Sequence, residues 1–144
     1  MELDKNFSPQ TSDFKIYLND IGLMCTMGNL HQTIMIKDHN LYTEFNGMIT
    51  EQFVLQQLIT SSFKPFYWNP EMGISEVDFV IQRDNQFIPN EVKLNENLKS
   101  RSLNSYYERY KPDTCIKTSL SSYKKQEWME NIPLYSLLSW LQTN

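Results

Sequence analysis

The chain has few of the residues that mark specialised classes of protein. Four glycines and six prolines among 144 residues exclude collagen-like and low-complexity chains. The two cysteines, Cys25 and Cys115, lie far apart and outside any CxxC motif, so we expect reduced thiols in a cytoplasmic protein. No apolar run approaches the roughly 20 residues that span a bilayer. The N-terminal MELDK lacks the basic start and apolar stretch of a signal peptide, and we expect no membrane partner.

The composition is that of one folded domain. Hydrophobic residues make up 40% of the chain and aromatic residues 13%, and a chain of this length buries one sizeable core rather than two. Residues 1–13 are polar, and we expect them to be loosely ordered. Residues 14–144 contain no internal repeat, linker or low-complexity tract, so we expect them to form a single domain.

The spacing of apolar residues predicts an α/β fold with a mixed sheet. Strands are expected at 14–18, 66–68, 76–82, 87–94, 114–118 and 132–135. Helices are expected after the cap at 19–20, over 46–62 and 98–110, and at the C-terminus. Helices and strands therefore alternate, with an α-β-β-β-α-β order in the middle of the chain.

The charge is unevenly distributed along the chain. The net charge of −4 argues against a general, tight nucleic-acid binder, but residues 93–125 carry +5 and the remainder −9. The basic residues of this segment are Lys93, Lys99, Arg101, Arg109, Lys111, Lys117, Lys124 and Lys125. Aromatic residues interleaved with them could stack on nucleobases while the cations hold phosphates. The alternative, which this feature alone favours, is a solvated helix face with its aromatic side chains turned inward.

Two expected strands joined by Asp84–Asn85 bring charged residues together. A two-residue turn there sets Asp78 directly opposite Glu91 and Glu76 directly opposite Lys93, with all four side chains on one face. Like charges in directly opposed positions are destabilising, and a divalent cation such as Mg²⁺ between the two carboxylates removes that penalty. The structural alternative is that Glu76 forms an ion pair with Lys93 and that Asp78 only accepts hydrogen bonds.

The helix expected over 46–62 adds a third carboxylate. Its apolar stripe consists of Val54, Leu55, Leu58 and Ile59, and its other face of Gln52, Gln56, Gln57 and Thr60. Glu51 falls within the apolar stripe, where an ionised carboxylate needs a partner or a metal ion. We therefore expect Glu51, Asp78, Glu91 and Lys93 to converge on one site.

The order Glu51, then Asp78, then Glu91-Val92-Lys93 resembles the PD-(D/E)xK nuclease superfamily, whose signature lies on a hairpin. Longer stretches are similar to one domain found behind the ATPase module in a group of bacterial and archaeal AAA+ ATPases. These stretches are FKIYLNDIGL (14–23), NGMITEQFV (46–54), YW (67–68), EVDFVI (76–81), IPNEVKLNENLKSRSL (88–103), YKPD (110–113) and NIPLY (131–135). The chain contains no GxxxxGK[ST] phosphate loop, which excludes ATP hydrolysis by that route.

The resemblance implies a restriction-endonuclease-like α-β-β-β-α-β core that hydrolyses phosphodiester bonds in nucleic acid. It implies that Asp78 and Glu91, completed by Glu51, bind Mg²⁺ (or Mn²⁺), and that Lys93 holds the attacking water or stabilises the transition state. Lys99 and Arg101 would contact phosphates. The implied partners are DNA rather than RNA, an AAA+ ATPase module in cis or in trans, and a second copy of the chain in a homodimer.

Two other classes of function stay open on the sequence. One is a catalytically inactive, nuclease-like domain that docks a partner or regulates an AAA+ ATPase. The other is a nucleic-acid-binding module that uses the basic segment without cleaving its ligand.

Overall fold

The computed structural model describes residues 15–28, 39–70, 75–94 and 100–143, with only the backbone described for 39–44. Residues 1–13, expected to be loosely ordered, lie outside this part. In chain order the elements are α1 (Ile21–Met27), α3 (His39–Thr60), β1 (Phe66–Trp68), β2 (Val77–Arg83), β3 (Gln86–Lys93), α4 (Arg101–Tyr110), β4 (Ile116–Ser119), β5 (Lys124–Lys125), β6 (Glu130–Pro133), a 3₁₀ turn η1 (Leu134–Ser136) and α5 (Leu137–Thr143). None of the described helices is long and apolar enough to cross a membrane.

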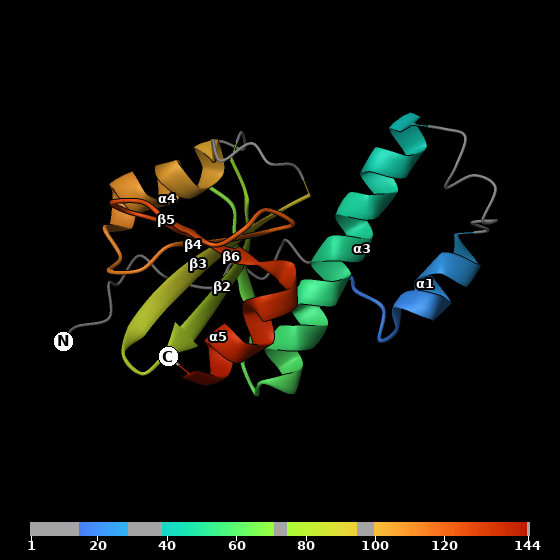
Figure 1. Cartoon of the computed structure of the whole chain (residues 1–144), viewed down its shortest axis with the longest axis horizontal. Coiled ribbons are helices and arrows are strands. Elements are labelled where there is room, and N and C mark those ends of the chain that lie inside the picture. The colour runs from blue at the N-terminus through green and yellow to red at the C-terminus, as the bar shows by residue number, and fades with distance from the viewer. Residues whose placement is uncertain (1–14, 29–38, 71–74, 95–99, 144) are drawn as a thin grey trace.

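The strands form one mixed sheet of six strands in the order β1-β2-β3-β4-β6-β5. Strands β1, β2 and β3 are antiparallel neighbours, whereas β3, β4 and β6 run parallel. The parallel step from β3 to β4 is made through α4, as a crossover connection requires. Helices cover both faces of this mixed sheet, which confirms the expected α/β class (Figure 1).

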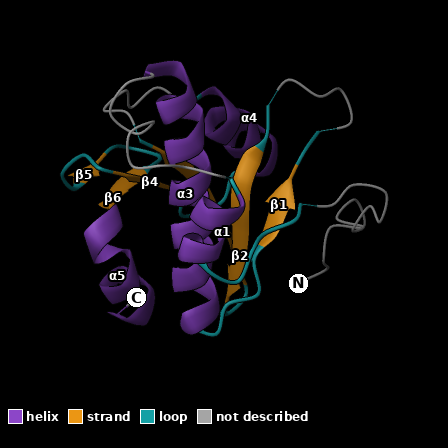
Figure 2. Ribbon diagram, turned by 90° about the vertical axis from the view of Figure 1, so that its right-hand side faces the viewer, coloured by secondary structure: helices purple, strands orange, loops and turns teal. Residues whose placement is uncertain are grey.

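Each face of the sheet has its own apolar cluster. The cluster under α3 and α5 consists of Val54, Leu55, Leu58, Phe79, Ile81, Ile88, Val92, Ile116, Ile132, Leu137 and Leu141. The cluster under α4 consists of Trp68, Val77, Val80, Leu103, Tyr106, Cys115 and Met129. Figure 2 shows α3 in front of the sheet and α4 behind it. Burial on both faces explains why the central strands contain long apolar runs.

The β2–β3 hairpin has the register that the sequence predicts. Its paired residues run from Arg83 and Gln86 at the turn to Phe79 and Asn90, and the next residues along the two strands are Asp78 and Glu91. Asp84 adopts a left-handed conformation with φ of 51°, which a two-residue hairpin turn requires and which Asp tolerates. The hairpin therefore places Asp78 and Glu91 at the end opposite the turn.

Three expectations near α3 are wrong. Residues 15–18 do not form a strand, and Gln52, placed on the polar face, is only 1% exposed. The reason is that the segment before α1 lies along α3, where the Gln52 side chain accepts from the N–H of Leu18 at 3.1 Å and donates to its carbonyl. Ile59, placed in the apolar stripe, is 58% exposed. The buried face of α3 thus includes Gln52 and excludes Ile59, which the spacing of apolar residues does not predict.

Candidate functional site

Asp78 and Glu91 are buried carboxylates at the end of the β2–β3 hairpin. Asp78 is 8% exposed and Glu91 is 3% exposed. Oδ2 of Asp78 accepts a hydrogen bond from the backbone N–H of Val92 at 2.8 Å. Oε1 of Glu91 lies 3.3 Å from Nζ of Lys93, but Oε2 of Glu91 is buried without a hydrogen-bond partner. A buried acceptor without a partner is unfavourable, so this oxygen is suited to receive a cation or a donor.

A lysine that the sequence interpretation missed lies among the other acids. Nζ of Lys15 is 3.9 Å from Oε2 of Glu51 and 4.0 Å from Oδ1 of Asp78, and it forms an ion pair with Glu76. Glu51 also accepts a hydrogen bond from the hydroxyl of Tyr17 at 3.4 Å. No spacing rule links Lys15 to acids on a distant helix and strand, so only the fold brings them together.

The expected site is therefore divided into two groups. Glu51, Glu76 and Asp78 surround Lys15, whereas Glu91 contacts Lys93. The structural alternative, an ion pair of Glu76 with Lys93, is wrong, because Glu76 lies just before β2 and pairs with Lys15, while Lys93 contacts Glu91. Asp78 links the two groups, because its charge raises the pKa of both Glu51 and Glu91.

Burial and mutual repulsion raise the pKa of Glu51, Asp78 and Glu91. For Glu51 the main cause is desolvation, followed by the charge of Asp78, while Lys15 opposes the increase. For Asp78 desolvation raises the pKa, against the hydrogen bond from Val92 and the charge of Lys15. Burial likewise raises the pKa of Glu91. A cluster whose ionised form is unfavourable gains stability when a cation binds it.

A second buried lysine is located beside Glu91. Lys117 on β4 is the strand neighbour of Glu91 on β3, and its side chain is fully buried. Burial lowers the pKa of Lys117, while the charge of Glu91 raises it. Lys117 is one of the basic residues of segment 93–125 that the sequence offered as possible phosphate contacts, and for this residue that role is wrong because its side chain is buried in the sheet.

Of the two candidate phosphate contacts, Arg101 lies within the described residues and Lys99 does not. Arg101 is exposed at the first residue of α4, directly after the N-cap Ser100. Tyr106 in the same helix is only 2% exposed and packs edge-on against Trp68, with ring centroids 5.3 Å apart. The inward orientation of this aromatic residue is confirmed, so Tyr106 is not available to stack on a nucleobase.

The donor set fits Mg²⁺ or Mn²⁺ in chemistry. Carboxylate oxygens are the ligands that these hard cations prefer, and Oε2 of Glu91 is a buried acceptor with no partner. Among the residues that the structure describes, however, no three His, Cys, Asp or Glu side chains lie close enough together to hold a metal ion. The ammonium of Lys15 lies within ion-pair distance of three of the acids in this arrangement.

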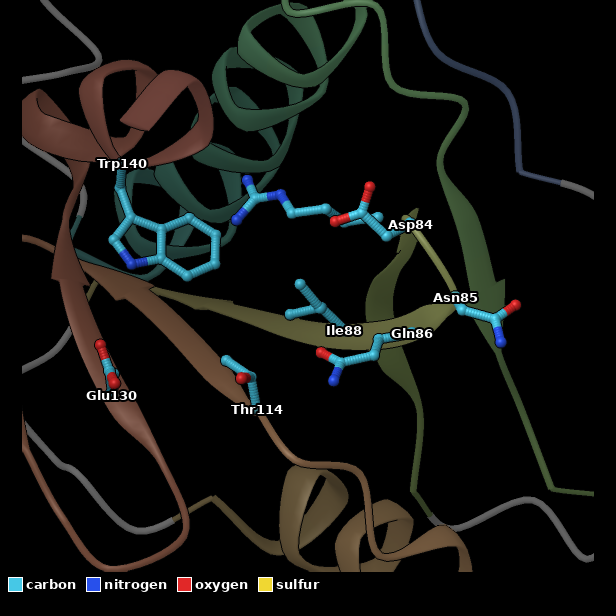
Figure 3. Close-up of a pocket in the computed structure, with 8 residues that line it drawn as sticks. Asp84, Asn85, Gln86, Ile88, Thr114, Glu130 and Trp140 are labelled. Atoms are coloured by element: carbon cyan, nitrogen blue, oxygen red, sulfur yellow. The ribbon is translucent and has the colours of Figure 1, made fainter. Parts of the chain in front are cut away.

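A separate cavity of about 360 Å³ opens at the turn end of the hairpin (Figure 3). It is lined by Arg83, Asp84, Asn85, Gln86, Ile88, Thr114, Glu130 and Trp140. The guanidinium of Arg83 donates to the carbonyl of Leu141 at 3.0 Å and stacks on Trp140, 4.6 Å from the ring centroid. Arg83 thus fastens the end of α5 to the sheet. None of the carboxylates of the candidate site lines this cavity.

Comparisons with known proteins give one family. No curated protein and no solved structure matches the chain. A family model described as "Domain of unknown function (DUF4143)" matches residues 46–137, which include Glu51, Asp78, Glu91 and Lys93 but not Lys15. Because the match covers more than half of the 144 residues, the chain belongs to this family.

Proposed function

We propose that the chain is a metal-dependent nuclease domain that hydrolyses phosphodiester bonds in nucleic acid. The observation that carries the proposal is the pair of buried carboxylates at the end of the hairpin. Asp78 on β2 and Glu91 on β3 are the next residues after the pair Phe79 and Asn90, so they lie side by side on neighbouring strands. Glu91 also has a buried oxygen without a hydrogen-bond partner. A sequence selected only for a stable hairpin avoids two acids at such positions.

The order of elements around the pair supports the same proposal. Helix α3 precedes three antiparallel strands, and α4 then leads to a strand parallel to β3. This α-β-β-β-α-β order agrees with the core of the PD-(D/E)xK nucleases, which the sequence resembles. In that superfamily the acids of the hairpin and the first helix belong to one site, as proposed for Asp78, Glu91 and Glu51.

The role that we propose for each side chain follows from its exposure to solvent. Asp78 and Glu91, completed by Glu51, would hold Mg²⁺ (or Mn²⁺), which supplies a more acidic water and shields phosphate charge when bound. The side chain of Lys93 is 51% exposed next to Glu91, so its ammonium can contact a phosphate or a water from the solvent side. Arg101 is an exposed cation at the start of α4, where a helix N-terminus also favours phosphate. Duplex DNA is the proposed substrate and a homodimer the proposed assembly.

A second candidate function is a non-catalytic domain that docks or regulates an AAA+ ATPase supplied in cis or in trans. The DUF4143 domain is often found with such ATPases. The observation that favours this candidate is Lys15, whose ammonium already lies within ion-pair distance of three carboxylates. A non-cleaving nucleic-acid-binding module is the third candidate, supported only by exposed basic residues such as Arg101.

Metal binding tests the first proposal directly. We would titrate Mn²⁺ and Mg²⁺ calorimetrically into the wild type, Asp78→Asn and Asp84→Asn. Asp84→Asn is the matched control, because it makes the same chemical change at the turn end of the same hairpin, where Asn also tolerates a φ of 51°. We expect the wild type and Asp84→Asn to bind and Asp78→Asn to lose binding.

Cleavage assays on duplex DNA and on single-stranded RNA then follow for the same three proteins. A wild type that binds no Mn²⁺ and cleaves neither substrate contradicts the nuclease proposal and favours the docking domain. Salt-dependent DNA binding that is equal in the wild type and Asp78→Asn, without cleavage, favours the third candidate.

A further inference from the structure

The ammonium of Lys15 lies where carboxylates from three parts of the fold meet. Its partners are Glu51 on α3, Glu76 just before β2 and Asp78 within β2. Three formal negative charges thus face one positive charge, and the side chain of Lys15 is only 24% exposed. A cation is therefore already bound in the acidic cluster, and it is part of the chain.

The backbone around Lys15 is fastened to α3 by specific contacts. Gln52 bonds to both the N–H and the carbonyl of Leu18, and Gln56 donates to the carbonyl of Asn19 at 2.8 Å. The ring of Tyr17 packs against Phe79, with centroids 5.9 Å apart, and its hydroxyl donates to Glu51. These contacts hold residues 17–19 against α3 and the sheet, so the position of the neighbouring Lys15 is built into the fold.

A second observation concerns the buried carboxylate of Glu91. Glu91 is 97% buried, and its Oε2 has no hydrogen-bond partner. Asp78 interacts electrostatically with both Lys15 and Glu91. Lys15 therefore pairs with Glu51 and Glu76, whereas an oxygen of Glu91 remains without a hydrogen-bond partner.

We infer that Lys15 is a built-in counter-ion of the acidic cluster that competes with a divalent metal ion for Glu51 and Asp78. This inference rests on the proposed function for the identity of the metal. Binding of the divalent cation requires the ammonium to leave these two carboxylates, because two cations at this distance repel each other. Lys15 thereby determines the concentration of divalent cation at which the cation occupies Glu51 and Asp78.

The test compares three substitutions by calorimetric titration with Mn²⁺. Lys15→Met removes the charge and keeps the length of the side chain, Lys15→Arg keeps the charge, and Lys111→Met is a control at an exposed lysine paired with Glu108. We expect Lys15→Met to bind Mn²⁺ at least about tenfold more tightly than the wild type. Lys15→Arg and Lys111→Met should bind with an affinity close to that of the wild type.

Thermal unfolding gives a second readout that does not require an active nuclease. Without metal, Lys15→Met should have a lower Tm than Lys15→Arg, and Mn²⁺ should raise the Tm of Lys15→Met by more. If the wild type binds Mn²⁺ and Lys15→Met binds it equally or more weakly, the inference is wrong while the metal site stands. If neither protein binds Mn²⁺, the proposed nuclease function and the competition are both rejected.

Discussion

Lys117 on β4 is the strand neighbour of Glu91 on β3, and both side chains are buried. A buried lysine next to a buried glutamate stabilises the ionised carboxylate, and metal binding requires that form. Burial raises the pKa of Glu91, whereas the charges of Lys93 and Lys117 lower it. Lys117 is therefore a positioning residue, which acts through Glu91 rather than on a substrate.

Replacing Lys117 by Met should shift the pH dependence of metal binding upward. The charge that lowers the pKa of Glu91 is lost, so Glu91 remains protonated to a higher pH. We expect the affinity for Mn²⁺ to fall several-fold at the acidic end of a pH series and much less at its alkaline end, measured by calorimetry across the series. Lys124→Met, at an exposed residue of β5, is the control. A pH profile for Lys117→Met that coincides with the wild-type profile contradicts this role.

Asp78→Asn should make the metal-free protein more stable at neutral pH. Burial raises the pKa of Asp78 above its ordinary value, despite the hydrogen bond from Val92 and the charge of Lys15. A carboxyl group whose pKa is higher in the folded chain than in the unfolded chain lowers stability as it ionises, so stability falls with rising pH through this range. The amide oxygen of Asn can still accept from Val92.

Chemical denaturation checks the sign of this effect. We expect the free energy of unfolding to increase by roughly 1 kcal/mol at pH 7, and the difference to shrink as the pH falls below the ordinary aspartate pKa. Asp84→Asn should leave stability nearly unchanged at both pH values. If Asp78→Asn is less stable at pH 7, attraction to Lys15 outweighs desolvation at this site.

The sequence predicts the hairpin and its acids because the interactions that define them are local. A two-residue turn fixes the pairing of β2 with β3, and alternation then places Asp78 and Glu91. The sequence does not predict the contacts of Lys15, since they depend on how the segment before α1 crosses α3. The burial of Lys117 was not predicted for a related reason, because a single lysine in a short strand has no periodicity that signals burial.

The burial of Gln52 on α3 is another feature that the sequence does not predict, and it leads to a third prediction. Its side chain is 1% exposed and bonds to both backbone groups of Leu18. Gln52→Ala removes two hydrogen bonds to partly buried backbone groups, so we expect a loss of about 1–3 kcal/mol in the free energy of unfolding. Hydrogen exchange at the N–H of Leu18 should become faster. Gln57→Ala, on a less buried position of the same helix, should change stability by less than about 0.5 kcal/mol.

Substitution of Lys93 distinguishes a catalytic role of this residue from a role in metal binding. Its side chain is 51% exposed, and its Nζ lies 3.3 Å from Glu91. If its ammonium stabilises the transition state, Lys93→Ala should reduce the cleavage rate of duplex DNA by about 10²–10³. The charge of Lys93 also lowers the pKa of Glu91, so the assay belongs near pH 8, where loss of that charge affects metal binding least. Mn²⁺ affinity should then be close to the wild-type value.

Two further variants make this result decisive. Lys93→Arg keeps a cation beside Glu91 and should recover part of the rate, whereas Lys111→Ala should cleave like the wild type. If Lys93→Ala loses metal affinity and cleavage in equal proportion at pH 8, the lysine serves only to keep Glu91 ionised. In that case the ammonium contributes to loading the site and not to the transition state, because an effect confined to the transition state leaves metal binding unchanged.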